Sequence, residues 1–308
     1  MRIQRWVIVV AIMVGVVVTG SISPSQAETL RVVGFNVESG GADPNVVDDL
    51  IARLQDIDIW GFSEVQNASW AQLFEVAAED GEGVDFVQVL GTTGGGDRLL
   101  IVYDADRFEL VQQFELHDIN PQGRVRAPLV AHLKITATGQ EFFFMVNHLF
   151  RTNNAARHEQ ARLLNAWARH QTLPVIAVGD YNYDWDVSQG ETRHDQGFDE
   201  MTRDEVFVWV RPPALVATQC SRQFNSVLDF IFAAHAAKTW QGSSEILERQ
   251  PDYCPDSNAT SDHRPVLATF MLSEPSPQSG NRAAILERIE RIESELRELK
   301  TLIEQLPE

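Results

Sequence analysis

The chain has 308 residues, of which 44% are hydrophobic and 22% charged, a composition that is typical of a folded globular protein and excludes a disordered chain. The formal net charge of −19 makes the surface repel polyanions at long range, which excludes a protein that coats nucleic acid non-specifically. A local cationic cleft remains compatible with this charge.

Residues 1–27 have the pattern of a secretory signal peptide. Arg2 and Arg5 precede an almost wholly apolar run over residues 6–20, and Ser25-Gln26-Ala27 places small residues at the positions that signal peptidase reads. An uncleaved anchor is the alternative, because the apolar run is slightly long. Loss of the two arginines changes the formal charge from −19 to −21. The mature chain is predicted to be secreted or periplasmic, without a stable membrane span.

Strands and helices alternate through the first half of the predicted fold. Apolar spacing predicts strands over residues 30–37, 57–65, 86–90 and 99–103, and helices over residues 44–55 and 68–79. Asp43 precedes Pro44 and is predicted to cap the first helix. The glycine-rich segment 91–97 matches neither a P-loop nor a dinucleotide fingerprint, so a mobile loop is predicted there.

The second half continues with strands and one long helix. Spacing predicts strands over residues 112–116, 128–135, 142–146, 175–179, 227–232 and 266–271, a helix over 154–171, and a loop over 183–197. Trp185 in that loop is either a partly buried anchor or an aromatic that faces substrate. Cys220 and Cys254 are the only cysteines, and in an exported chain they predict one disulfide.

Polar side chains follow or interrupt several of these apolar strands. Asp180 and Asn182 follow the strand over residues 175–179, and two-residue spacing on an extended backbone points them the same way. Taken alone, Glu64 is either a salt-bridged rim residue or a metal ligand, and His148 is either structural or catalytic. Asp229 lies inside an apolar run and needs a partner, because burying a lone carboxylate is costly.

Six of these motifs together resemble the endonuclease/exonuclease/phosphatase superfamily, which has the DNase I-like fold. They are Phe35-Asn36, Ser63-Glu64-Val65-Gln66, Asn147-His148-Leu149, Gly179-Asp180-Tyr181-Asn182, Leu228-Asp229-Phe230-Ile231 and Ser261-Asp262-His263-Arg264-Pro265, in the order of the family. The resemblance implies a catalytic domain over residues 28–272 of the α+β class. Its architecture is expected to be a four-layer α/β/β/α sandwich of two mixed, mostly antiparallel sheets.

The resemblance also implies the chemistry of the site. The family hydrolyses phosphate esters by in-line attack of water with a divalent cation, usually Mg²⁺, and Mn²⁺ or Ca²⁺ are alternatives. Asn36, Glu64 and Asp262 are the implied metal ligands, and Asp180 and Asn182 the pair that orients water and contacts phosphate. His263 matches the catalytic histidine polarised by Asp229, and His148 a second one. By analogy with the DNase I branch, Asp97 orients His148 and Arg126 contacts phosphate.

The family resemblance leaves the substrate open. A secreted, nuclease-like phosphodiesterase is favoured, because no hydrophobic hairpin with clustered aromatics is visible that could enter a lipid surface. The mature charge of −21 argues against a nucleic-acid substrate. A sphingomyelinase or other phospholipase and an inositol-phosphate phosphatase are alternatives. A non-catalytic, multimerised binding protein is a remote alternative, since every motif position keeps a competent residue.

The C-terminal tail is predicted to assemble the protein. Residues 273–281 read as a linker. The seam that follows in residues 282–308 alternates spacings of four and three, at Ile285, Ile289, Ile292, Leu296, Leu299, Ile303 and Leu306. This heptad pattern predicts a coiled-coil helix that forms a homodimer or homotrimer. An amphipathic helix that folds back on its own domain is the alternative.

Overall fold

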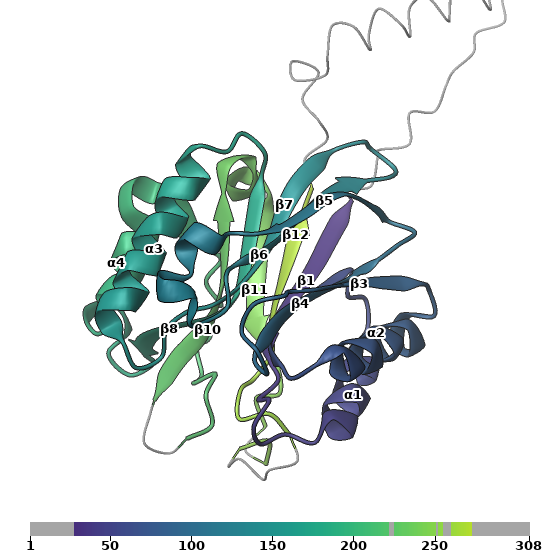
Figure 1. Cartoon of the computed structure of the whole chain (residues 1–308), viewed down its shortest axis with the longest axis horizontal. Helices are drawn as coiled ribbons and strands as arrows, with labels where there is room; N and C mark the ends of the chain where they lie inside the picture. The colour runs from purple at the N-terminus through teal and green to yellow at the C-terminus, as the bar shows by residue number, and fades with distance from the viewer. Residues whose placement is uncertain (1–27, 222–224, 251, 255–259, 273–308) are drawn as a thin grey trace, which may run out of the picture.

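The computed structural model describes residues 28–221, 225–250, 252–254 and 260–272 (Figure 1). The predicted signal peptide, linker and coiled-coil helix lie outside the described residues. Within the described part, none of the helices combines the length and the apolar character needed to cross a membrane.

Two six-stranded sheets form the centre of the molecule. The first has the order β11-β12-β1-β2-β4-β3 and the second β5-β6-β7-β8-β10-β9. The strands of the first sheet are β1 (Thr29–Asn36), β2 (Ile59–Val65), β3 (Phe86–Leu90), β4 (Arg98–Asp104), β11 (Gln241–Ile246) and β12 (Val266–Met271). The strands of the second are β5 (Phe108–Glu115), β6 (Leu129–Ile135), β7 (Glu141–His148), β8 (Val175–Asp186), β9 (Phe207–Trp209) and β10 (Ser226–Ala234). Each sheet has one parallel pair, β1 with β2 and β7 with β8, so the prediction of mixed, mostly antiparallel sheets is confirmed.

Helices cover the outer face of each sheet (Figure 1). They are α1 (Pro44–Arg53), α2 (Ala68–Glu82), α3 (Asn154–Arg169) and α4 (Gln196–Thr202). Buried side chains of α1 and α2 pack on the first sheet, and those of α3 and α4 pack on the second. Asp43 caps α1 by accepting a hydrogen bond from the Asn45 backbone N–H at 3.0 Å, and Pro44 occupies the first helical turn as the sequence predicts.

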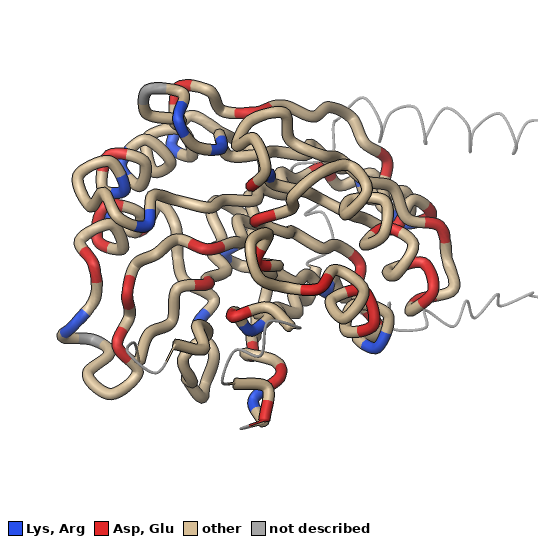
Figure 2. The backbone as a smooth tube through the Cα atoms, turned by 60° about the horizontal axis from the view of Figure 1, so that its bottom comes forward, with Lys and Arg blue, Asp and Glu red and all other residues tan. Residues whose placement is uncertain are grey.

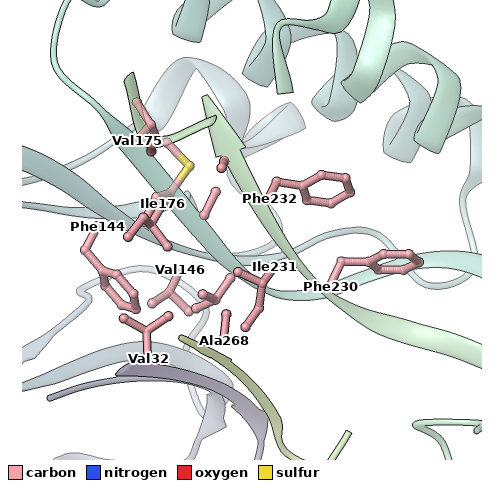
Figure 3. Close-up of a cluster of buried hydrophobic side chains, with 14 of the residues drawn as sticks. Val32, Phe144, Val146, Val175, Ile176, Phe230, Ile231, Phe232 and Ala268 are labelled. Atoms are coloured by element: carbon pink, nitrogen blue, oxygen red, sulfur yellow. The ribbon is translucent and has the colours of Figure 1, made fainter. Parts of the chain in front are cut away.

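A layer of buried hydrophobic side chains joins the inner faces of the two sheets. Figure 3 shows Val32 of β1 facing Phe144 and Val146 of β7. Gly61 of β2 lies directly against the second sheet, because a Cβ there would be 2.4 Å from a methyl carbon of Val178 on β8. Any larger residue at this position would overlap the opposite sheet, so glycine lets the two sheets meet.

The loop predicted over residues 183–197 is wrong at both ends. β8 continues to Asp186, where Trp185 pairs with Val227 of β10 and is only 3% exposed, and α4 begins at Gln196. The short elements β9, β11 and α4 were not predicted, because apolar periodicity needs a longer window than they provide. Boundaries of the other predicted elements agree within a few residues.

Candidate active site

The predicted catalytic groups come together where the parallel strand pairs of the two sheets end. In the second sheet, Asp180 of β8 is paired in register with His148 of β7 on one side and with Asp229 of β10 on the other. In the first sheet, the parallel pairing of β1 with β2 ends at Asn36 opposite Ser63, and Glu64 follows Ser63. The site therefore forms where the parallel pairing ends in both sheets.

Irregular backbone at these strand ends aims the side chains. Glu64 and Asn182 have φ values of 62° and 54°, which are unusual for residues with a side chain. The φ of Gly179 is 137°, and a Cβ at this position would lie 1.9 Å from the carbonyl oxygen of Asn147. Only glycine is compatible with this approach of β8 to β7 immediately before Asp180.

Asp180 lies at the centre of a buried hydrogen-bond network. Its Oδ2 accepts from Asn36 Nδ2 at 3.1 Å, and its Oδ1 accepts from the Asn182 backbone N–H at 3.0 Å. Asn36 Nδ2 also donates to Glu64 Oε1 at 3.0 Å, so one amide bridges the two carboxylates. The Glu38 backbone N–H donates to Asn36 Oδ1 at 3.0 Å, which fixes this orientation of the amide. The metal-ligand role predicted for Asn36 needs the amide to turn over and stays a prediction.

His263 and Asp229 form a buried dyad beside Asp180. His263 Nδ1 lies 2.8 Å from Asp229 Oδ2, and its Nε2 is 3.9 Å from Asp180 Oδ2 and 3.8 Å from Asp262 Oδ1. Burial favours the neutral imidazole, but the charge and hydrogen bond of Asp229, followed by the charges of Asp180 and Asp262, outweigh burial and raise the pKa of His263 to about 10. His263 is therefore an imidazolium at neutral pH. Asp229 has the partner that its place in an apolar strand requires.

The raised pKa of His263 predicts how stability depends on pH. A pKa that is higher in the folded state than in the unfolded chain (6.5) gives stability that is fully present below pH 6.5 and is lost as the pH rises to about 10. In EDTA, the difference in free energy of unfolding between the native chain and His263→Ala should therefore shrink across this interval. Urea unfolding at a series of pH values measures the difference. A difference that stays constant from pH 6 to 10 would contradict the shift.

His148 is held from behind by Asp97 and Arg126. Its Nδ1 lies 3.5 Å from Asp97 Oδ1, and its Nε2 lies 3.4 Å from Asp180 Oδ2 and 3.9 Å from Glu64 Oε1. Burial opposes ionisation of Asp97, but the nearby His148, followed by Arg126, lowers its pKa. Arg126 donates to Asp97 Oδ2 at 2.6 Å and to the His148 carbonyl at 2.9 Å. These donors of Arg126 are already occupied by Asp97 and by the His148 carbonyl. The predicted contact of Arg126 with phosphate therefore stays a prediction.

A cleft of about 780 Å³ opens in front of these groups. Six predicted site residues line it, namely Glu64, His148, Asp180, Asn182, Asp262 and His263. Asn36, Asp97, Arg126 and Asp229 contact these residues from behind the cleft wall. The sequence prediction did not include Arg151, Arg157, Arg193, His194 and Asp195, which also line the cleft. Arg151 is two residues beyond the Asn147-His148-Leu149 motif, and this proximity is the one sequence signal that could have indicated it.

The predicted disulfide between Cys220 and Cys254 is confirmed and lies next to the site. The Cys220 backbone N–H donates to the Asp262 carbonyl at 2.7 Å, and the Tyr253 hydroxyl donates to the His263 carbonyl at 2.7 Å. Both segments that the disulfide joins therefore hold the backbone of Asp262 and His263. Ser261 completes this wall by donating to the Asn36 carbonyl at 2.6 Å.

Removal of the disulfide should lower both stability and activity. The cysteines are 34 positions apart, and loop-closure entropy gives such a cross-link about 3–4 kcal/mol. We expect Cys220→Ser/Cys254→Ser to lose about this free energy of unfolding in urea. We also expect kcat to fall, since the wall that carries His263 loses its anchor. Loss of stability with unchanged kcat would show that the remaining hydrogen bonds suffice to position His263.

Comparison with known proteins agrees with the family resemblance that the sequence motifs indicate. The model of the Endonuclease/Exonuclease/phosphatase family matches residues 33–263. No curated protein matches the chain significantly. Among solved structures, an endonuclease/exonuclease/phosphatase family protein from Bacteroides thetaiotaomicron has a TM-score of 0.60 at 21% identity and covers 80% of this chain and 95% of its own.

Two further solved structures have the same fold and different substrates. A mannosyl-6-phosphatase from Bacteroides thetaiotaomicron has a TM-score of 0.60 at 20% identity, covering 79% of this chain and all of its own. TDP2 from D. rerio, complexed with a single-strand DNA product, has a TM-score of 0.60 at 17% identity, covering 79% of this chain and 99% of its own. At these identities the similarity establishes the fold.

Proposed function

The chain belongs to the endonuclease/exonuclease/phosphatase family, whose members hydrolyse phosphate esters, and we propose that it acts as a metal-dependent phosphodiesterase of the nuclease type. The observation that carries the proposal is the position of Asp180 between two histidines. Its Oδ2 lies 3.4 Å from His148 Nε2 and 3.9 Å from His263 Nε2, and each histidine has its own carboxylate behind it. This arrangement combines a buried base with two groups that can donate to phosphate oxygens.

The donors at one end of the cleft fit a hard divalent cation. Carboxylate oxygens of Glu64 and Asp180 lie within 4.8 Å of each other, and a ring nitrogen of His148 lies within the same distance of both. The Glu64 side chain is 25% exposed, and its Oε2 has only a long contact to the Ser39 hydroxyl, at 3.5 Å, among the described residues. Carboxylate oxygens are the ligands that Mg²⁺ prefers, and Asp262 can add another from the opposite wall. A cation bound there supplies positive charge to a phosphoryl oxygen.

The side chains of the chain itself would perform the remaining steps. Asp180 accepts a proton from the attacking water, and Asn182 positions this water or the phosphate from the same strand. His263 is protonated at neutral pH, because the Asp229 carboxylate raises the pKa of His263. As an imidazolium it donates Nε2–H to a phosphoryl oxygen. His148 Nε2 lies 3.4 Å from the same Asp180 oxygen as His263 and can protonate the leaving oxygen. These groups stabilise the charge that develops in the transition state.

The size of the cleft favours a diester over a small monoester. About 780 Å³ exceeds what one phosphate group fills, and the lining residues extend from Glu64 to Arg193. TDP2, with its single-strand DNA product, shows that this fold accommodates a polynucleotide. The mannosyl-6-phosphatase makes a phosphomonoesterase the second candidate. Lipid and inositol-phosphate substrates are further alternatives.

Nicking of supercoiled plasmid tests the proposal. The mature chain in Mg²⁺ should convert the plasmid to the open circle, whereas His263→Ala and an EDTA lane should not. Bis(p-nitrophenyl) phosphate should be hydrolysed faster than p-nitrophenyl phosphate. The opposite preference, without nicking, would indicate a monoesterase. Hydrolysis of sphingomyelin or inositol phosphates in place of both would sink the nuclease proposal.

We also propose that the enzyme acts outside the cytosol and as a homo-oligomer. The Cys220–Cys254 disulfide supports an oxidising compartment, and the signal-peptide pattern of residues 1–27 agrees with it. The heptad seam in residues 282–308 supports assembly. Light scattering of residues 28–308 should give a dimer or trimer mass that reverts to monomer in residues 28–272. Equal monomer masses would contradict assembly, and full activity in a purely cytosolic fraction would contradict export.

A further inference from the structure

We propose that Arg151 and Arg193 form a second anion-binding subsite in the catalytic cleft, which takes a phosphate group adjacent to the scissile one. The inference rests on the proposed function and identifies the class of substrate. This class is an ester with at least two phosphate groups, as in a nucleotide strand or a polyphosphorylated alcohol. Both arginines line the same cleft as Glu64, Asp180 and His263.

The guanidinium groups of the two arginines remain largely available for a ligand. Arg151 is exposed, and its guanidinium forms no hydrogen bond or ion pair with any residue that the structure describes. The Arg193 side chain is 66% exposed, and its closest acidic partner is Asp186 Oδ2 at 3.6 Å. An exposed ion pair at this distance contributes little. Arginine presents paired donors that match phosphate oxygens, so the two side chains suit a phosphate better than a neutral group.

A buried ion pair holds the backbone segments of the two arginines together. Arg157 of α3 is 4% exposed and donates to the Arg151 carbonyl and to the Phe150 carbonyl, both at 2.8 Å. It also donates to the two carboxylate oxygens of Asp195, at 3.2 Å and 2.6 Å, and Asp195 is two residues beyond Arg193. The segments are thus fixed before a ligand arrives, which lowers the entropy cost of binding.

Asp195 remains ionised in this clamp, so Arg157 is already neutralised. Burial favours the neutral acid, but hydrogen bonds from Arg157, His158 and the Gly197 backbone outweigh burial and lower the pKa of Asp195. The positive charge of Arg157 is therefore balanced within the clamp by the carboxylate of Asp195. The charge available at this end of the cleft comes from Arg151 and Arg193.

The charged lining residues fall into two hydrogen-bonded groups. Glu38, Glu64, Asp180 and Asp262 are linked around Asn36. The ion pair of Arg157 with Asp195 links the segments of Arg151 and Arg193, which are called the arginine end here, and the exposed Asp184 also lines the cleft. The chain as a whole carries −19, and acidic residues outnumber basic ones along the described backbone (Figure 2). A general positive surface therefore does not account for this pair of arginines. Because the scissile phosphate belongs beside His263, an anion at the arginine end is a second group of the same substrate.

Paired substrates that differ by terminal phosphates test the subsite. The thymidine dinucleotide TpT has one internal phosphate, and pTpTp adds one at each end. We expect kcat/KM of the native chain to be about tenfold higher for pTpTp, mainly through a lower KM, as two arginine–phosphate contacts would give. In Arg151→Gln/Arg193→Gln this ratio should fall to about one. Inositol bisphosphate against inositol monophosphate is the second arm, and it shows whether the adjacent phosphate belongs to a nucleotide strand or to a polyphosphorylated alcohol.

A matched control separates the subsite from net charge. Arg162→Gln/Arg169→Gln removes two exposed arginines of α3 that do not line the cleft, and it should leave the ratio of pTpTp to TpT unchanged. A ratio near one in the native chain, on both substrate pairs, would overturn the inference. An equal fall in both double variants would also overturn it, because bulk charge would then be the cause.

Binding without turnover distinguishes failure of the subsite from failure of the proposed function. Calorimetric titration of His263→Ala with TpT and pTpTp reports affinity alone. Tighter binding of pTpTp that disappears when Arg151 and Arg193 are also replaced supports the subsite even if the native chain hydrolyses neither ligand, and only the proposed function then fails. Equal affinities for the two ligands overturn the subsite whatever the activity of the enzyme.

Discussion

The His263→Ala variant should lose about 10³-fold in kcat for phosphodiester hydrolysis, within the range known for removal of a positioned acid or base. The structure gives the reason, since His263 Nε2 lies 3.9 Å from Asp180 Oδ2 while Asp229 Oδ2 lies 2.8 Å from Nδ1. Without the imidazolium, charge on the phosphoryl oxygens loses one of its nearest donors. Steady-state kinetics with bis(p-nitrophenyl) phosphate and plasmid nicking measure the loss.

Two further variants make this result specific to the dyad. Asp229→Asn keeps the shape of the side chain but removes the charge that keeps the imidazole protonated, so we expect an intermediate loss of about 10²-fold. His132→Ala removes a histidine that pairs with Glu141 outside the cleft, at 2.8 Å, and should retain full activity. If His263→Ala folded normally by circular dichroism and kept more than a tenth of kcat, the assignment of the site would be wrong.

The Glu64→Gln variant should need far more Mg²⁺ for activity and lose more than about 100-fold in kcat/KM at fixed Mg²⁺. Glutamine keeps the size of Glu64 and can still accept from Asn36 at the position of Oε1, so loss of charge is the main change. The chain should also lose activity in EDTA and recover it when Mg²⁺ is added. Activity as a function of Mg²⁺ concentration and calorimetric titration with Mg²⁺ measure the two effects.

A carboxylate elsewhere serves as the control for Glu64. Glu109→Gln removes an exposed acid that pairs with Lys134, at 2.9 Å, and does not line the cleft. Its Mg²⁺ dependence should equal that of the native chain. An unchanged Mg²⁺ dependence in Glu64→Gln would move the cation to another part of the cleft.

The groups at the centre of the site could be predicted because each is marked within a short segment. Glu64 and Asp180 follow apolar strands, and Asp229 interrupts one, so a local pattern exposes all three. Their motifs occur along the chain in the same order as in the family, which indicates that the three residues belong to one site. The sheet class was implied by the family resemblance, and the disulfide followed from the cysteine count.

The arginine end of the cleft could not be predicted in this way. Arg157 and Asp195 are 38 positions apart, and their pairing depends on how α3 packs beside α4. The length of β8 was missed for a related reason. Tyr183 and Trp185 are buried while Asp184 is exposed, which is strand alternation, but the polar residues around them are equally typical of a loop. Tertiary contacts decide such cases, and a single sequence does not contain them.

The pairing of β1 with β12 determines when the domain can fold during synthesis. Thr29 lies opposite Met271, so the first strand of the domain cannot pair with β12 until residues 266–271 have been synthesised. The bonds that assemble the reacting groups span 144 positions between Asn36 and Asp180 and 225 between Ser261 and Asn36. Such high contact order makes folding slow and all-or-none. A nascent or truncated chain therefore has no catalytic centre, and hydrolytic activity begins only after the whole domain has been made.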